Sequence, residues 1–225
     1  MSSAKRRKYG PWPGPVLTKM QLWAWLALYR TLKRFRYFAF LGGYENSQGP
    51  ILFTTWLMQK VIGFNRSAYW GVHFTSKVVQ PKHIIVGKHT NPGIEPGCYI
   101  QGIGKVTFGD YTKVAANRWI ISSNHYVNDR ESHVSGAVTI GSYCWIGANC
   151  VILPGVELGD FTVVGAGSVV TRPHPEGYCV IAGNPARKIK DLDPQACKRT
   201  ERDRPFVGYM PAEDFDTFRR DRLWV

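Results

Sequence analysis

The chain has 225 residues, 44% of them hydrophobic, which is enough for one sizeable core with some appended structure. Lysine and arginine total 29 against 16 aspartate and glutamate, and the resulting formal charge of +13 favours anionic partners. No acidic residue precedes Glu45, so the basic charge is concentrated at the N-terminus.

The cysteines are dispersed, with no CxxC pair and no metal-finger spacing. They are Cys98, Cys144, Cys150, Cys179 and Cys197. This pattern is typical of reduced thiols in a cytoplasmic protein. The only early apolar run starts at Leu22, lacks a small-residue cleavage site and is interrupted by Arg30 and Lys33. We therefore expect neither a secretory signal nor a membrane-spanning helix.

Residues 1–83 form a basic, aromatic-rich extension in which we predict a helix from Met20 to Leu41. A second apolar stretch runs from Ile51 to Ile62. Aromatic side chains lie beside a stripe of three cations, Arg30, Lys33 and Arg34. This composition suits a peripheral contact of residues 20–62 with the inner face of a membrane. It suits equally well a helix that packs over the end of the next domain or over a neighbouring subunit, so both alternatives stay open.

An aliphatic residue then returns at every sixth position, at Ile140, Ile146, Ile152, Leu158, Val164 and Val170. A period of six fits neither a helix nor a plain alternating strand. It fits short strands stacked into a triangular coil, in which each aliphatic side chain points inward and a small neighbour permits the tight corner. We therefore predict an all-β core built as a β-helix.

The same period marks an earlier block, at Ile94, Ile100 and Val106, then at Val114 and Ile120. The interval from Ile120 to Ile140 is not a multiple of six, so a loop must leave the coil over residues 121–139. We place the coil domain at residues 84–190. Residues 191–225 form a charged tail that we expect to be peripheral, with a short helix around Pro211 to Arg222.

The inserted loop contains the candidate general base, His125. A neutral imidazole accepts a proton near pH 7, and a loop position makes it accessible to a substrate. Asp129 and Glu131 lie close in sequence, and either carboxylate could orient the ring. Asn124 is a candidate for substrate contact, with a purely structural turn role as the alternative.

The segment from Asn124 to Lys190 resembles the hexapeptide-repeat acetyltransferases, in particular the maltose and galactoside O-acetyltransferases and the polysaccharide-biosynthesis acetyltransferases. The elements that carry the resemblance are WIGANCVILPGV, VGAGSVVT and GNPAR, in this order and spacing. The resemblance covers about Ile84 to Lys190, with the densest motifs after Asn124, and it is loose before Ile84. It implies a left-handed parallel β-helix, acetyl-coenzyme A as acyl donor, a sugar or glycan acceptor and a homotrimer whose active sites are shared between adjacent coils.

The resemblance also implies roles for individual residues. His125 of the NH motif would be the general base, and Trp145 would lie close to the acceptor and the acyl group. Glu95 and Asn117 occupy positions where related enzymes place polar groups that face the acceptor or the acyl carbonyl. The residues expected to meet coenzyme A are Ala148, Ala166, Thr171, Arg172, Arg187 and Lys190. If a carboxylate stands at position 95, the oxyanion must be stabilised by another group.

Several other functions compete with O-acetylation of a sugar. A zinc enzyme on the same coil needs three converging histidines, and the spacing of His83, His89, His125 and His133 does not supply the close pair, so we expect no metal. A non-catalytic scaffold would not need His125, Trp145 and the cationic groove end together. The short basic cluster from Lys5 to Lys8 is a solvated tail rather than a nucleic-acid site. N-acylation of a nucleotide-linked amino sugar remains the alternative within the enzyme interpretation.

Overall fold

The computed structural model describes residues 19–43, 49–129, 131–203 and 205–225. Its helical elements are α1 (Lys19–Leu32), η1 (Arg36–Phe38), α2 (Phe40–Gly43), α3 (Phe53–Trp56), the π-helical turn η2 (Leu57–Ile62), η3 (Pro81–His83), η4 (Ala212–Asp214) and α4 (Phe215–Arg222). None of the helices in these ranges is long and apolar enough to cross a bilayer. The N-terminal cluster Lys5 to Lys8 lies outside the described residues.

The helix predicted from Met20 to Leu41 is broken. α1 ends at Leu32, and Phe35 has an extended backbone before the short turns η1 and α2. The break allows the chain to fold back, so that the hydroxyl of Tyr29 donates to the carbonyl of Leu41. Phe40 and Leu41 are thereby buried in a small second core, which a straight helix with aromatic residues on every side could not achieve.

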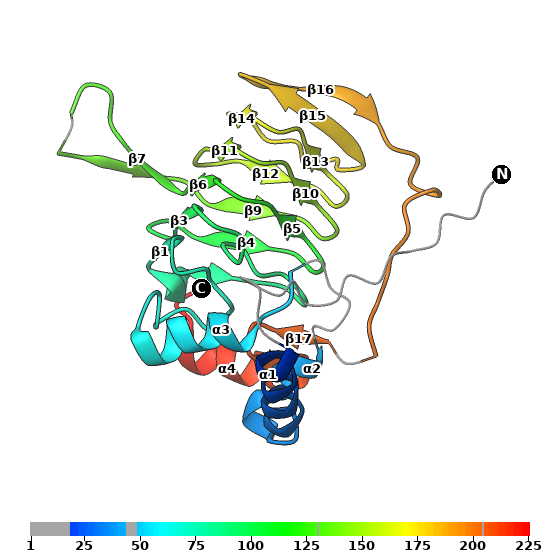
Figure 1. Cartoon of the computed structure of the whole chain (residues 1–225). Coiled ribbons are helices and arrows are strands. Elements are labelled where there is room, and N and C mark those ends of the chain that lie inside the picture. Colours follow the sequence, from blue (N-terminus) through cyan, green and yellow to red (C-terminus); the bar gives the residue numbers. More distant parts are fainter. Residues whose placement is uncertain (1–18, 44–48, 130, 204) are drawn as a thin grey trace.

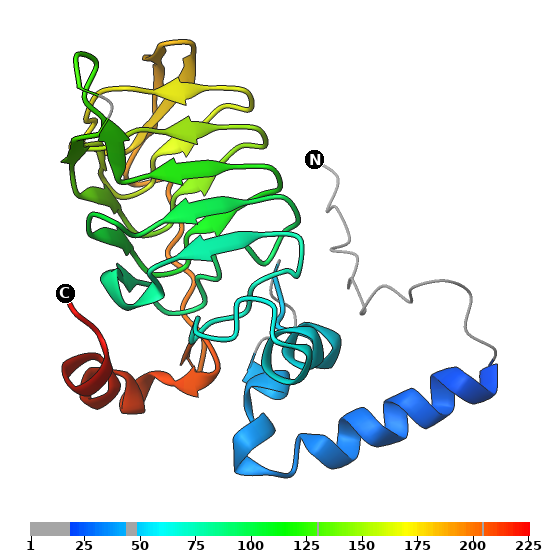
Figure 2. The same cartoon turned by 90° about the vertical axis from the view of Figure 1, so that its left-hand side faces the viewer.

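Short parallel strands stack into a coil with three flat faces (Figures 1 and 2). The first face consists of β1 (Lys77–Val79), β3 (Tyr99–Gln101), β6 (Trp119–Ile121), β11 (Val151–Ile152) and β14 (Val169–Val170). The second consists of β5 (Lys113–Val114), β10 (Trp145–Ile146), β13 (Val163–Val164), β15 (Cys179–Gly183) and the antiparallel β16 (Ala186–Asp191). The third consists of β2 (Ile84–Ile85), β4 (Val106–Phe108), β9 (Val138–Ile140) and β12 (Glu157–Leu158). The predicted all-β coil is therefore confirmed.

The aliphatic residues of the six-residue period fill the interior. Ile140, Ile146, Ile152, Leu158, Val164 and Val170 are all buried. On the second face Trp145 pairs with Val163, so one turn of the coil spans three repeats of the period, one for each face. Lys113 pairs with Trp145 although the chain between them is longer than one regular turn, because the excursion leaves the coil and returns within that interval.

The coil begins earlier than Ile84, the boundary that the sequence suggested. β1 pairs in parallel with β3, and Val78 lies opposite Ile100. The coils at this end are irregular, because the interval from Val78 to Ile100 is not a multiple of the six-residue period. Ile94, which we placed in phase with the repeat, is half-buried and packs against the second core instead of filling the coil.

One corner of the coil carries a column of stacked rings: His89, Tyr111, Tyr143, Phe161 and Tyr178. All five have a positive φ, which the corner requires. The glycine two positions before Tyr111 explains the close stacking, since a Cβ on Gly109 would lie 2.4 Å from the backbone nitrogen of Ser142 on the next coil. A segment near the C-terminus lies against this column, with Arg199 5.6 Å from the Tyr143 ring centroid.

The residues after position 191 cap the coil, whereas we expected a peripheral tail. They descend to the base as β17 (Phe206–Val207), β18 (Met210–Pro211) and α4 (Figure 1). The amide of His89 donates to the carbonyl of Phe206, and the side chains of Val207 and Leu223 are buried in the main core. The physical reason is that the open end of a coil exposes interior apolar residues that must be covered. The predicted short helix is present as α4.

We predict that truncation of an interior residue destabilises the coil much more than truncation of its outward neighbour. Leu158→Ala should lower the free energy of unfolding by about 2–5 kcal/mol, because Leu158 is buried in the stack. Glu157→Ala on the same strand should change it by less than about 0.5 kcal/mol, because Glu157 is exposed. Urea unfolding at one fixed protein concentration measures both, and equal losses would contradict an interior packed at Leu158.

Candidate functional site

The excursion from the coil is an antiparallel hairpin that projects away from the stack (Figure 1). It consists of β7 (Ser123–His125) and β8 (His133–Ser135), with His125 directly opposite His133. The centroids of the two imidazole rings are 4.2 Å apart. Both residues are exposed, so the hairpin presents a pair of imidazoles outside the body of the coil. Of these two histidines, the sequence analysis selected only His125 as a candidate general base.

The carboxylate of Asp129 holds the turn of this hairpin. It accepts hydrogen bonds from the Ser132 hydroxyl and, at 3.0 Å, from the Glu131 amide. The Ser132 hydroxyl, and after it the Glu131 amide, lowers the pKa of the Asp129 carboxyl. Asp129 therefore shapes the loop, and its predicted role in orienting His125 remains a prediction. Glu131 is exposed, and Asn124 lies in β7 opposite Val134.

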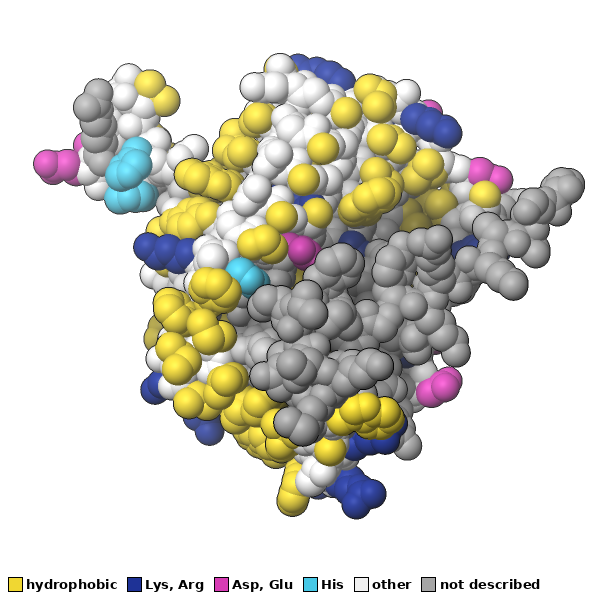
Figure 3. All heavy atoms as spheres, viewed as in Figure 1, with side chains coloured by type: hydrophobic (Ala, Val, Ile, Leu, Met, Phe, Trp, Pro, Cys, Tyr) yellow, Lys and Arg dark blue, Asp and Glu magenta, His cyan; other side chains and the backbone are white. Residues whose placement is uncertain are grey.

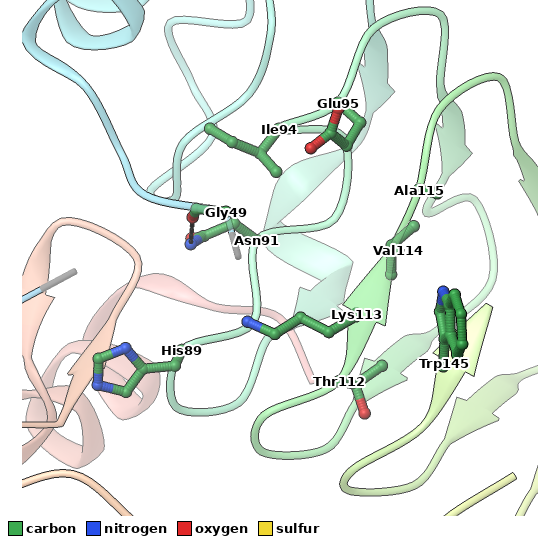
Figure 4. Close-up of a pocket in the computed structure, with 10 residues that line it drawn as sticks. All are labelled: Gly49, His89, Asn91, Ile94, Glu95, Thr112, Lys113, Val114, Ala115 and Trp145. Atoms are coloured by element: carbon green, nitrogen blue, oxygen red, sulfur yellow. Dashed lines mark hydrogen bonds between the residues drawn. The ribbon is translucent and has the colours of Figure 1, made fainter. Parts of the chain in front are cut away.

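Trp145 lies on a different face of the prism, at the edge of a pocket of about 110 Å³ (Figure 4). Its side chain is 60% exposed. Glu95, predicted to face the acceptor, lines the same pocket. The structure thus brings Glu95 and Trp145 together, although they are far apart in the chain.

Three polar residues of this pocket were missed by the sequence analysis: Asn91, Thr112 and Lys113. Lys113 is the neighbour of Trp145 on the second face, and burial, with a smaller effect of Arg202, lowers the pKa of its ammonium. Asn91 is buried, and its amide donates to the carbonyl of Gly49 at 3.4 Å. The pocket therefore combines a carboxylate, a cation and an amide within reach of one small polar molecule. Only the register across the excursion reveals the position of Lys113.

Asn117 serves the coil corner. It has a positive φ, and its amide N–H donates to the carbonyl of Pro96 at 2.9 Å. A Cβ on Gly97 would lie 2.1 Å from the Asn117 side-chain oxygen, so the two residues are in close contact. Asn is one of the few residues that adopts this backbone conformation readily. The corner thus explains Asn117 without a ligand, and its predicted contact with the acceptor remains a prediction.

Small residues form a second column, at the corner that follows the second face. A Cβ on Gly147 would lie 2.5 Å from the backbone nitrogen of Ala166, and one on Gly165 would lie 2.9 Å from the Cβ of Ala182. Ala148 and Ala166 therefore lie one above the other, with little side chain to cover the backbone. Arg187 is directly opposite Ala182 in the β15–β16 hairpin, so a guanidinium lies near the top of this small-residue corner.

The other cations expected to meet coenzyme A are spread around the upper end of the coil. Lys190 is exposed on β16, opposite Val180. Thr171 and Arg172 follow β14 on the first face and are exposed. The neighbouring Lys188 is paired with Asp191 at 2.9 Å, which raises the pKa of its ammonium. Lys188 thus has a carboxylate partner, whereas Arg187 extends from the edge of the small-residue corner.

A buried arginine supports both the pocket and this corner from inside the coil. Arg118 is 1% exposed, and its guanidinium donates to the carbonyls of Ala115, which lines the pocket, and Gly147, which precedes Ala148. Burial lowers the pKa of Arg118 to about 10, so it stays charged at neutral pH. We had no reason to select it from the sequence, because a lysine or arginine at a corner is usually solvated.

His125 and Trp145 do not meet within one chain. The hairpin leaves the first face through β6, whereas Trp145 belongs to the second. Among the residues that the structure describes, none of those that line the Trp145 pocket comes from the hairpin. A site that uses both residues therefore requires a second copy of the chain. In the part of the chain that the structure describes, no three His, Cys, Asp or Glu side chains are grouped to hold a metal ion.

Residues 137–172 match the family model described as bacterial transferase hexapeptide (six repeats). Galactoside O-acetyltransferase of Escherichia coli (strain K12) is 40% identical over 93 residues, which are 39% of this chain and 45% of that protein. The putative lipopolysaccharide biosynthesis O-acetyl transferase WbbJ of the same strain is 38% identical over 105 residues, 41% of this chain and 53% of that protein. The chain spans about half the length of the curated relatives it matches.

The same relationship appears in three dimensions. A solved galactoside acetyltransferase in complex with coenzyme A superposes with a TM-score of 0.52 and 30% identity, over 60% of this chain and 67% of that one. The coil is thus a left-handed parallel β-helix. The chain belongs to the hexapeptide-repeat transferase family, in the branch that includes the galactoside acetyltransferases.

We predict that loss of the Arg118 guanidinium destabilises the fold beside the Trp145 pocket. Arg118→Met should lower the free energy of unfolding by about 1–3 kcal/mol, because it leaves buried carbonyl oxygens without a donor. Arg172→Met, which removes an exposed cation, should have little effect. Urea unfolding at pH 7 compares the two variants. Identical midpoints would show that the buried guanidinium does not stabilise the fold.

Proposed function

We propose that the protein is an acetyl-coenzyme A-dependent O-acetyltransferase that acts on a sugar hydroxyl in surface polysaccharide biosynthesis. The names of its relatives, a galactoside and a putative lipopolysaccharide O-acetyltransferase, support this assignment, as does the coenzyme A in the solved relative. One observation carries the proposal: the inserted hairpin holds the exposed imidazole of His125 outside a coil whose second face bears the Trp145 pocket.

In the proposed reaction, His125 takes the proton from the acceptor hydroxyl as its oxygen attacks the carbonyl carbon of the thioester. The tetrahedral intermediate then collapses, the C–S bond breaks, and the leaving coenzyme A thiolate receives the proton from the imidazolium. We assign the stabilisation of the oxyanion to the ammonium of Lys113, because it lines the pocket beside Trp145 and the carboxylate of Glu95 has no proton to donate.

Coenzyme A would lie along the small-residue corner. The low side chains of Ala148 and Ala166 let a pantetheine amide approach the backbone, and Arg187 or Lys190 would pair with the phosphates. Thr171 and Arg172 are assigned to the nucleotide end on the basis of the family resemblance.

We further propose a homotrimer in which each site is formed by two chains. The support is geometric: His125 and Trp145 belong to different faces of the prism, and three copies can place the hairpin of one against the pocket of the next. Family resemblance supports the number three.

The proposed location is the cytoplasm, with the acceptor carried at the inner face of the membrane. Exposed aromatic residues in the N-terminal region, such as Trp23 and Phe35, support a peripheral contact there.

We predict that His125→Ala lowers turnover by about 10²- to 10⁴-fold, the usual range for a removed general base. The assay is release of the coenzyme A thiol from acetyl-coenzyme A across a panel of sugars and amino sugars, which also separates O-acylation from N-acylation. His133→Ala is the matched control, because His133 lies directly opposite on the same hairpin, and we expect it to lose much less. Full activity in His125→Ala would exclude this base. No turnover of any acceptor by the unmodified protein would favour a non-catalytic scaffold.

We also predict complementation between two inactive variants. Chains with His125→Ala and chains with Trp145→Ala, co-expressed in equal amounts, should recover roughly a quarter of the sites if each site takes one residue from each of two chains. Either variant alone should remain impaired. Activity no higher than the mean of the two separate variants would place both residues in one chain and contradict a shared site.

A further inference from the structure

The largest cavity among those described lies at the base of the coil, outside the proposed catalytic site. Its volume is about 540 Å³, and it shares no lining residue with the Trp145 pocket. Five aromatic side chains form most of its wall: Tyr37, Phe40, Trp56, Tyr69 and Tyr209. They come from the N-terminal helices, the start of the coil and the C-terminal hairpin. The cavity thus exists only because the C-terminal cap packs against the N-terminal extension.

The aromatic wall is fixed by edge-to-face contacts. The rings of Tyr37 and Trp56 meet at 6.1 Å, and those of Phe40 and Tyr209 meet at 5.0 Å. The hydroxyl of Tyr209 donates to the side-chain oxygen of the buried Gln59 at 2.7 Å. Such a wall is preformed and offers apolar contact area to a ligand at little ordering cost.

Two cations complete the lining. The ammonium of Lys60 donates to the carbonyls of Arg66 and Ala68, at 2.9 and 2.6 Å, and lies 5.2 Å from the Tyr209 ring centroid. An ammonium has three hydrogens, so one stays available for an acceptor. The Arg36 guanidinium is 88% exposed, and its carboxylate neighbour, Asp214, is 3.9 Å away. Both cations can therefore face an anion in the cavity.

The N-terminal surface beside the cavity is apolar. Exposed large hydrophobic side chains there are Phe35, Tyr37, Leu57, Val61, Ile62 and Phe64. Figure 3 shows hydrophobic side chains gathered over this part of the base, with lysine and arginine next to them. Glu45 is the only acidic residue of the sequence before Glu95, so this part of the chain contributes cations and almost no carboxylates. Such a surface complements the headgroup region of an anionic bilayer.

We propose that this cavity binds the phosphate group of an anionic membrane lipid, held by Lys60 and Arg36 against the aromatic wall, while the apolar surface beside it enters the bilayer. The proposal is independent of acetyl transfer. It assigns a ligand to the base of the coil, where a peripheral membrane contact is proposed above.

The test is co-sedimentation of the full chain with vesicles. Vesicles of phosphatidylcholine alone should bind weakly, and vesicles that contain about one quarter phosphatidylglycerol should bind strongly. Arg36→Gln should weaken this binding about fivefold, the effect of one cation near an anionic surface. Lys188→Gln is the control: it removes one positive charge from β16, at the end of the coil away from the base (Figure 1), and should change binding less than about twofold. Equal effects of the two substitutions would overturn the site.

A soluble arm distinguishes the lipid from a free phosphate. Short-chain phosphatidylglycerol, used as a monomer, should bind in calorimetry, and glycerol phosphate should bind at least about tenfold more weakly because it lacks the apolar part. Lys60→Gln should weaken the binding of both probes, because it removes a cation that pairs with their common phosphate, and Arg36→Gln serves if Lys60→Gln does not fold. Equal affinity for the two probes would make the cavity a site for soluble phosphates and refute the proposal.

The pH dependence of lipid binding tests whether Lys60 is a ligand of the phosphate. Burial, with a smaller effect of Arg66, lowers its pKa to about 8, so lipid binding should weaken as pH rises from 7 to 9. The other charged groups beside Lys60 are Arg36, which lines the same cavity, and Arg66, whose carbonyl accepts from the Lys60 ammonium. Burial raises the pKa of the Tyr69 phenol. The other phenols that face the cavity are those of Tyr37 and Tyr209. Binding independent of pH would exclude Lys60 as a ligand.

A contact between copies of the chain is the competing use of this surface. Val61→Asp should abolish vesicle binding without changing the mass in solution, because Val61 is 51% exposed beside the cavity. A changed mass with unchanged vesicle binding would instead assign the surface to a protein interface. Thiol release from acetyl-coenzyme A, measured without vesicles, checks that each variant is folded.

Discussion

The hydrogen bonds between successive coils are the constraint on which the structure depends. In the regular part of the stack each short strand pairs in parallel with the strand one full turn further on, so every side of the coil must contain the same number of residues. Corners without a Cβ, as at Gly109 and Gly141, bring the backbones of adjacent coils together. The insertion after β6 leaves the coil as a separate element, the hairpin that carries His125. The coils at the base, by contrast, take up additional residues and are irregular.

The prism shape places the candidate catalytic side chains on different faces of the coil. Flat faces built from very short strands have no deep cleft of their own, so polar side chains are distributed around the perimeter. The imidazoles lie on the hairpin, and the pocket with Trp145 and Lys113 lies on another face. In the proposed trimer, catalysis would depend on apposition of faces from different copies. The rigid stack, supported from inside by Arg118, fixes the geometry that each copy presents.

The base of the coil is closed by contacts between distant parts of the chain. Its exposed edge and apolar interior have to be covered, and segments from both parts of the chain cover them. Tyr209 from the C-terminal hairpin packs on Phe40 from the N-terminal extension. The column of stacked rings holds the descending C-terminal segment along one corner, since Arg199 donates to the Tyr178 hydroxyl. Capping thus produces a cavity separate from the Trp145 pocket, lined by aromatic rings and by the cations Arg36 and Lys60.

The sequence by itself determined the coil, its interior residues such as Ile146 and Leu158, and the excursion that carries His125, because a six-residue period is a local pattern that needs no knowledge of distant contacts. It could not determine the pairing of His125 with His133 or of Trp145 with Lys113, since those pairs depend on strand register across the insertion. Only the tertiary structure decided that Arg118 is buried, that α1 ends at Leu32 and that the charged C-terminus caps the base. Each of these three features depends on which apolar surfaces remain exposed once the coil has formed, and a local sequence pattern does not contain that information.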